Sequence, residues 1–304
     1  MGERLAGSPD LRQGSAALPT QEPASLAWSS LRRGVPVFLD DVPAASADLP
    51  RRLRISSGTK RLAVEGQQGT KYEKGFFVPR DDWRALSGEE LGLLEGRDAC
   101  DLAGDIRLFA IPAWLQQFFW DLDPARLVAG SEFSAKVEDR LFNSFCDEAG
   151  AALAALGIPS RRLNVRFQKA RARSTTFDPE FGTFVGLHVD NFERRPIDLR
   201  HRSFPRLVIN LGLQPRSFVF VNLPLIDLLD PAGIPHSAET YRRYSWAYPL
   251  AHAFMAARPD YPVLRLELRP GEGYCAPTQN LVHDGYTSEG DGTDVVLSGF
   301  VKIS

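Results

Sequence analysis

Short apolar runs that alternate with turn-forming residues fill the second half of the chain, and this pattern limits the possible folds most strongly. Strands are predicted at 163–171, 184–190, 206–213, 217–223, 263–269, 273–278, about 280–283 and 294–303. Residues at about 225–257 interrupt them with a helical pattern. About eight short strands separated by turns predict a double-sheet jelly roll, which is the cupin-like double-stranded β-helix.

The first half of the chain has a mixed pattern, so the predicted fold class is α+β with flanking helices. A strand is predicted at 34–40, and helices at 81–95 and 131–157. Asp81 and Asp82 are placed at the start of the first helix, where the helix dipole favours negative charge. The second helix has Ser131 as a plausible N-cap and Gly157 as its stop, and it should cover the outside of a sheet.

The predicted organisation is one catalytic domain that follows a tail. Residues 1–25 are predicted to be a flexible tail, since they are rich in small and polar residues without periodicity. Residues 26–304 form the domain, in which 26–160 are a mixed and helical support and 161–304 are the jelly-roll core.

Composition excludes several classes of protein. The formal net charge of -2 argues against a nucleic-acid binder, which would carry a basic excess. The three cysteines are too widely spaced for a disulfide framework or a zinc knuckle. No apolar run approaches the ~20 residues of a membrane span, and no signal peptide is recognisable. We therefore expect a cytoplasmic protein without a membrane or nucleic-acid partner; the sequence does not indicate its oligomeric state.

Two histidines and one aspartate form the candidate metal centre. His188, Val189 and Asp190 make an H-x-D triplet, and residues two apart in a strand point to the same face. His283 follows a P-G-E-G turn at 270–273 and a further strand. Two histidines and one carboxylate leave about three open positions on an octahedral iron. The alternative is that both histidines are structural.

The order of these features resembles the Fe(II)/2-oxoglutarate-dependent dioxygenase superfamily over roughly residues 160–304. The resemblance implies that His188, Asp190 and His283 bind Fe(II), with 2-oxoglutarate as co-substrate and dioxygen as oxidant. It also implies hydroxylation, desaturation or ring formation on a small metabolite, with an amino acid or its derivative as one candidate. The carboxylate ligand argues against halogenation. A cupin-like metal-binding protein, or an oxygenase that does not use 2-oxoglutarate, is the alternative.

One part of the family pattern is missing, namely the arginine that binds the far carboxylate of 2-oxoglutarate. Many members place it in the final strand, where residues 293–298 contain no cation. We expect Arg206 to replace it, since strand alternation places Arg206 and Asn210 on one face. Arg166 and Gln168, which share a face of the first strand, are the alternative, and Lys302 is a third.

Arginines also gather just after the H-x-D triplet. They would suit an anionic or carboxylate-bearing substrate, although ordinary solubility is the slightly better explanation of any single one of them. The residues are Arg194, Arg195, Arg200 and Arg202.

Overall fold

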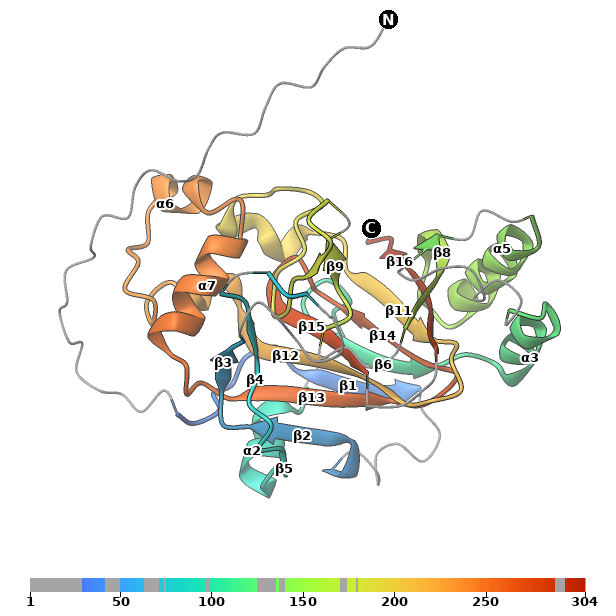
Figure 1. Cartoon of the computed structure of the whole chain (residues 1–304), viewed down its shortest axis with the longest axis horizontal. Helices are drawn as coiled ribbons and strands as arrows, with labels where there is room; N and C mark the ends of the chain where they lie inside the picture. Colours follow the sequence, from blue (N-terminus) through green and yellow to red (C-terminus); the bar gives the residue numbers. More distant parts are fainter. Residues whose placement is uncertain are drawn as a thin grey trace, which may run out of the picture.

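The chain folds into two stacked β-sheets with helices on their outer faces (Figure 1). The computed structural model describes residues 29–41, 50–62, 71–73, 75–96, 99–124, 135–136, 140–169, 174–178, 180–287 and 293–303. The large sheet has the strand order β1-β6-β14-β11-β16-β8-β7, and the small sheet β15-β12-β13-β2-β5. Apart from the parallel β1–β6 pair, the neighbouring strands are antiparallel.

The bounds of the strands follow the chain. The large sheet contains β1 (Val37–Asp41), β6 (Ile106–Ala110), β7 (Ala135–Lys136), β8 (Ser160–Lys169), β11 (Arg206–Asn210), β14 (Glu272–Ala276) and β16 (Thr293–Val301). The small sheet contains β2 (Leu53–Ser56), β5 (Arg84–Ala85), β12 (Arg216–Pro224), β13 (Val263–Leu268) and β15 (Leu281–Thr287). Two hairpins, β3 (Thr59–Arg61) with β4 (Phe77–Pro79) and β9 (Phe177–Asp178) with β10 (Thr183–Phe184), accompany them.

Strand alternation divides the core into an inner layer and two outer layers. Val208 of β11 and Phe218 and Phe220 of β12 belong to the inner apolar cluster between the sheets. Leu207 and Ile209 of β11 belong instead to a cluster on the outer face of the large sheet. Because each sheet buries both faces, the phase of a strand decides whether a residue lies in the interior or beneath a helix.

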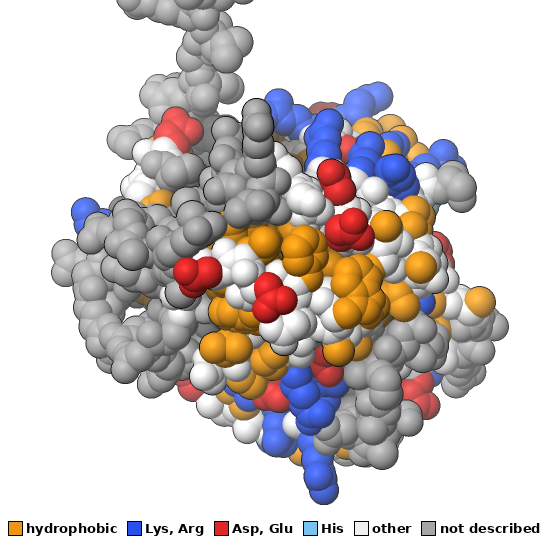
Figure 2. Space-filling view, turned by 90° about the vertical axis from the view of Figure 1, so that its right-hand side faces the viewer, with side chains coloured by type: hydrophobic (Ala, Val, Ile, Leu, Met, Phe, Trp, Pro, Cys, Tyr) orange, Lys and Arg blue, Asp and Glu red, His pale blue; other side chains and the backbone are white. Residues whose placement is uncertain are grey.

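Two groups of helices cover the outer faces. Figure 1 shows α3 (Ala113–Asp121) and α5 (Arg140–Ala155) at one end of the molecule and α6 (Ala238–Arg243) and α7 (Tyr248–Ala257) at the other. Helices α3 and α5 share the outer cluster of the large sheet, while α7 packs with Val219 and Val221 of β12. Figure 2 views the α3–α5 end, where hydrophobic side chains gather at the centre and basic side chains above and below.

Most of the strands predicted in the second half are present, and so is the helical interruption. The 3₁₀ helix η3 (Leu225–Leu228), α6 and α7 lie within the predicted 225–257. Gly157, with φ of +72°, follows α5 as expected. Ser131, the expected N-cap, lies outside the described residues. Within the part of the chain that the structure describes, no helix combines the length and apolarity that a membrane span requires.

Three predictions of local structure were wrong. The helix expected at 131–157 is shorter, since Ala135 and Lys136 form strand β7, which pairs with β8, and α5 begins at Arg140. Only Thr183 and Phe184 (β10) are regular strand near the expected 184–190, and His188 makes a single bridge to His283. The helix expected at 81–95 is the shorter α2 (Gly88–Leu94), because Ser87 and Glu90 form a reciprocal capping box that sets its start.

The P-G-E-G turn is fixed by a buried ion pair. Gly271 has φ of +82°, a conformation that glycine adopts without steric cost. The carboxylate of the next residue, Glu272, accepts hydrogen bonds from the Arg269 backbone N–H (2.7 Å) and from the buried guanidinium of Arg52, the residue before β2. This contact joins the segment that leads into β2 to the turn that leads into β14.

We predict that Glu272→Ala lowers the free energy of unfolding by about 3–5 kcal/mol, because it leaves the Arg52 guanidinium buried without its carboxylate. Asp81→Ala is the matched control, since the Lys60–Asp81 pair (2.6 Å) is 37% and 49% exposed and should contribute at most about 1 kcal/mol. Urea unfolding followed by circular dichroism measures both. Equal effects of the two substitutions would contradict the prediction.

Candidate metal centre

A backbone bridge brings the two histidines together across 95 residues of chain. The N–H of His188 donates to the carbonyl of His283 at 2.9 Å, and the N–H of His283 donates to the carbonyl of His188 at 2.8 Å. The residues therefore stand opposite each other, as in an antiparallel ladder. Their ring centroids are 4.6 Å apart, with the ring planes inclined at 46°.

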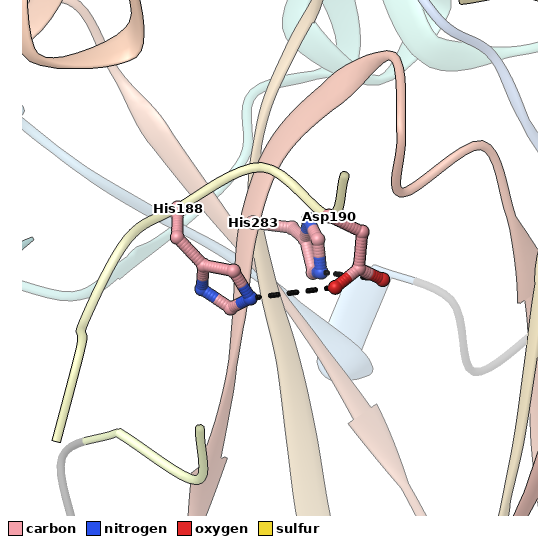
Figure 3. Close-up of side chains that lie close together, drawn as sticks. All are labelled: His188, Asp190 and His283. Carbon is pink, nitrogen blue, oxygen red and sulfur yellow. Dashed lines mark ion pairs between the residues drawn. The ribbon is translucent and has the colours of Figure 1, made fainter. Parts of the chain in front are cut away.

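Asp190 completes a cluster of three potential ligands (Figure 3). Its backbone N–H donates to the carbonyl of Thr278 at 3.1 Å, which holds the loop after His188 beside the turn that leads to β15. Its two carboxylate oxygens lie 3.8 Å from His188 Nε2 and 3.8 Å from His283 Nε2. The three candidate ligand atoms lie within 4.8 Å of one another.

The hydrogen bonds of the imidazoles suit metal binding through Nε2. His188 Nδ1 lies 2.7 Å from the carbonyl of Gly186, and His283 Nδ1 lies 3.0 Å from that of Leu281. A carbonyl only accepts, so each neutral ring carries its proton on Nδ1 and leaves the Nε2 lone pair free. Both Nε2 atoms face Asp190, so the donor set matches that of a two-histidine, one-carboxylate metal site.

The charges of the cluster favour an ionised carboxylate. Burial opposes the charged form of Asp190, but the imidazoles of His188 and His283 and the guanidinium of Arg206 outweigh it and hold the pKa of Asp190 far below its ordinary value. Burial, together with the neighbouring His188, lowers the pKa of His283 to about 4. His283 is therefore a neutral ligand at physiological pH, as metal binding requires.

A buried arginine outside the cluster holds the loop that carries Asp190. Arg200 lies in the 3₁₀ helix η2 (Ile197–Arg202) and is only 1% exposed. Its Nη1 donates to the backbone carbonyls of Asp190 (3.2 Å) and Gln279 (3.1 Å). The same guanidinium also donates to Arg195 O, Asn191 Oδ1 and Ser245 O.

The structure places Arg206 and Asn210 at opposite ends of β11. Arg206 is half-buried and lies beside the rings of Phe192 and Phe300, at 5.4 and 5.1 Å from their centroids. Its charge reaches the metal cluster, since it contributes to the low pKa of Asp190. Asn210 is buried at the other end. Its side-chain amide donates hydrogen bonds to the carbonyls of Gln214 and Leu268 and accepts one from the Gly212 N–H.

The other proposed anchors occupy different surroundings. Arg166 is exposed, and its Nε donates to Asn164 Oδ1 at 3.1 Å. Desolvation and the neighbouring Arg206 lower the pKa of Arg166, against the opposing effect of Asp190. The side chain of Gln168 lies outside the described residues. Lys302 lines a groove at the surface, beside Arg202 and Phe204.

The sequence analysis missed a buried cation in the interior. Arg216 begins β12 in phase with Phe218 and Phe220 of the inner cluster, and its Nε lies 3.3 Å from Asp294 Oδ1. The two side chains are 6% and 3% exposed. The spacing of Arg216, Phe218 and Phe220 could have revealed their common face, but only the pairing of the strands shows that this face is the interior.

No family model matches the sequence, and no curated protein matches it. Among solved structures, the chain is similar to the Kdo hydroxylase KdoO, a non-heme Fe(II) alphaketoglutarate dependent dioxygenase, in complex with alphaketoglutarate and Fe(III). That match has 18% identity and a TM-score of 0.36, and it covers 66% of this chain and 79% of that one. The cobalt(II) complex of KdoO matches at 16% identity and a TM-score of 0.34, over 66% and 80% of the two chains.

A second similar protein is the non-heme alpha ketoglutarate dependent epimerase SnoN from nogalamycin biosynthesis. It matches at 14% identity with a TM-score of 0.33, over 64% of this chain and 77% of that chain. These likenesses are remote.

We predict that His188→Ala and His283→Ala each abolish tight Fe(II) binding, because each removes one of two imidazole ligands. The exposed His236, which lies 3.2 Å from Asp230, provides the control His236→Ala, which should bind Fe(II) as the wild type does. Anaerobic Fe(II) titration followed by calorimetry measures the affinity. Wild-type affinity in either triad variant would show that the assignment is wrong.

We predict that Arg200→Lys weakens metal binding about tenfold and lowers the free energy of unfolding by about 2–3 kcal/mol. A lysine ammonium cannot satisfy the acceptors that the guanidinium reaches, and unsatisfied buried groups cost about 1–3 kcal/mol each. Arg202→Lys, two residues away and exposed, should change stability by at most about 0.5 kcal/mol. Metal titration and urea unfolding test both; unchanged metal affinity in Arg200→Lys would exclude a positioning role.

Proposed function

We propose that this chain is an Fe(II)- and 2-oxoglutarate-dependent oxygenase that oxidises a small metabolite. The observation that supports this most strongly is the cluster of His188, Asp190 and His283, in which both imidazoles present Nε2 to one carboxylate. A two-histidine, one-carboxylate site with open positions is typical of non-haem Fe(II) oxygenases. His188, Asp190 and His283 would hold the iron.

The strand pairing supports a double-stranded β-helix as the scaffold. From β8 onward, β8, β11, β14 and β16 belong to the large sheet, while β12, β13 and β15 belong to the small one. The bridge at His188 extends the small sheet beyond β15. The chain thus passes repeatedly between two facing sheets, as it does in a jelly roll. The metal cluster would lie at one open end of the interior.

The residues of this chain would have distinct roles around the iron. When bound, Fe(II) would coordinate 2-oxoglutarate and activate dioxygen for oxidation of the substrate. Asp190 supplies a negative charge that balances part of the charge of the metal. The Gly186 and Leu281 carbonyls orient the two imidazoles. Phe218 lies 5.7 Å from the ring of His283 and, with Tyr274 and Val208, would restrict water at the inner side.

Arg206 is the best candidate for the far carboxylate of 2-oxoglutarate. It is half-buried, and no carboxylate pairs with it among the described residues. Its charge acts on both Asp190 and His283, so it lies on the metal side of the interior. Arg216 is also buried, but Asp294 already neutralises it. A free guanidinium can bind a carboxylate through two parallel hydrogen bonds.

One observation favours the alternative, a cupin-like metal protein that does not use 2-oxoglutarate. At the place in the final strand where many superfamily members carry an arginine, this chain has Asp294, which pairs with Arg216. Because the two charges neutralise each other, this pair offers no free cation to a carboxylate. The two readings differ in whether the iron-loaded protein binds 2-oxoglutarate at all.

We predict that adding 2-oxoglutarate to the anaerobic Fe(II)-loaded protein produces a weak visible charge-transfer band. Arg206→Ala should raise the 2-oxoglutarate concentration that gives half of the full band by at least about tenfold, which corresponds to about 1.4 kcal/mol of binding free energy. Arg206→Lys should rescue only part of the affinity, since an ammonium does not reproduce a two-pronged contact. Arg166→Ala is the parallel variant. If Arg166→Ala alone weakens binding, the anchor lies on β8.

The absence of a band in the wild-type protein would favour the alternative reading instead. Succinate formed in the presence of dioxygen gives a second measurement. Screening small metabolites, carboxylate-bearing compounds and amino-acid derivatives among them, for increased succinate formation would identify the substrate.

A further inference from the structure

A surface groove lies beside the metal-binding loop and is separate from the three ligands. Its volume is about 730 Å³, which is within the range of small-molecule sites. The walls come from four parts of the chain that are distant in sequence. They are residues 100–103, residues 157 and 159 just before β8, residues of the segment 195–204, and residues 302 and 303 after β16.

The groove carries more positive than negative charge. Arg195, Arg202 and Lys302 line it together with His201, and Asp101 is the one acidic residue among the described lining residues. Arg195 is already paired with Glu193 at 2.8 Å. Arg202 and Lys302 are exposed, and neither forms an ion pair within the part of the chain that the structure describes. Two unneutralised cations therefore face one concave space.

The chemistry of these side chains suits an oxyanion. A guanidinium binds the oxygens of a phosphate or carboxylate as a planar fork, while an ammonium acts as a compact point charge. The guanidinium of Arg202 lies beside His201, with Nε 3.4 Å from Nε2. One oxygen of the Asp101 carboxylate already has a partner, since Oδ1 accepts a hydrogen bond from the Ala103 N–H at 3.0 Å.

The groove is connected to the metal-binding loop by short contacts. The wall that carries Arg195 and Phe204 begins a few residues after Asp190. Glu193 Oε1 accepts hydrogen bonds from the Phe204 N–H (2.7 Å) and from Gln279 Nε2 (2.9 Å), and Gln279 follows Thr278, the backbone partner of Asp190. A molecule in the groove therefore lies against the segment that positions the candidate metal ligand.

We propose that this groove is a binding site for the phosphate or carboxylate group of a small molecule, with Arg202 and Lys302 as its principal contacts. The proposal that the groove holds the anionic end of the substrate rests on the proposed function. As an oxyanion site it does not depend on iron or on 2-oxoglutarate. Binding of this group in the groove, apart from the three candidate metal ligands, would orient the substrate.

The test is calorimetric titration of the iron-free, 2-oxoglutarate-free protein with inorganic phosphate and, separately, with acetate. The double variant Arg202→Gln/Lys302→Gln removes both free cations. The matched control is Arg242→Gln/Arg243→Gln, which removes the same charge from exposed positions on α6. We expect saturable binding of at least one anion to the wild type and to the control, and at least a tenfold loss in the groove variant.

Tighter binding of phosphate than of acetate would identify a phosphate ester as the ligand class, and the reverse order a carboxylate. The proposal is overturned if the wild type shows no saturable binding of either anion, if the groove variant binds as the wild type does, or if the control loses affinity equally. Anaerobic Fe(II) titration of the groove variant should give the wild-type affinity, so that failure of the groove and failure of the metal centre are distinguishable.

Discussion

The burial of both faces of each sheet is the constraint on which the rest of this structure depends. Helices cover the outside and the sheets cover each other, so alternate residues of a strand enter different apolar layers. A polar residue in phase with the inner layer must then find a partner or face a ligand. Arg216 meets Asp294 inside, and Asn210 is satisfied by backbone groups.

The candidate metal centre is held mainly by backbone contacts. A reciprocal pair of hydrogen bonds joins His188 to His283, and the carbonyl of Thr278 fixes the main chain of Asp190. Carbonyls also set the tautomers of both rings. Backbone geometry is stiffer than side-chain geometry, so such an arrangement brings ligands together before any ion is bound. Arg200 extends the same principle, since it joins two chain segments through their carbonyl oxygens.

Positive charge is distributed unevenly around the interior and its mouth. Arg216 is neutralised within the fold, whereas Arg206 carries no paired carboxylate among the described residues and acts electrostatically on Asp190. Farther out, Arg202 and Lys302 face the groove without ion pairs in the described part of the chain. This order gives a candidate metal centre, a nearby cation and an outer cationic surface, an arrangement that would suit anionic small molecules.

The sequence by itself determined the strand-rich second half, the helical interruption and the residues of the metal cluster. These depend on local periodicity and on an H-x-D spacing, both of which are readable without partners. Alternation along β11 placed Arg206 and Asn210 on one face, and the structure shows that Leu207 and Ile209 pack outward while Val208 lies in the inner cluster. The irregular segment around His188 was predicted as a strand because its apolar residues resemble one, although it makes only one bridge.

The tertiary structure alone decided which cations are free. Arg206, Arg216 and Lys302 are equivalent as residue types, and their difference arises from contacts with Asp294, with aromatic rings or with solvent. Those contacts join residues that are far apart in the chain, as with Arg216 and Asp294. No local pattern encodes them, because they depend on which strands pair and in what register.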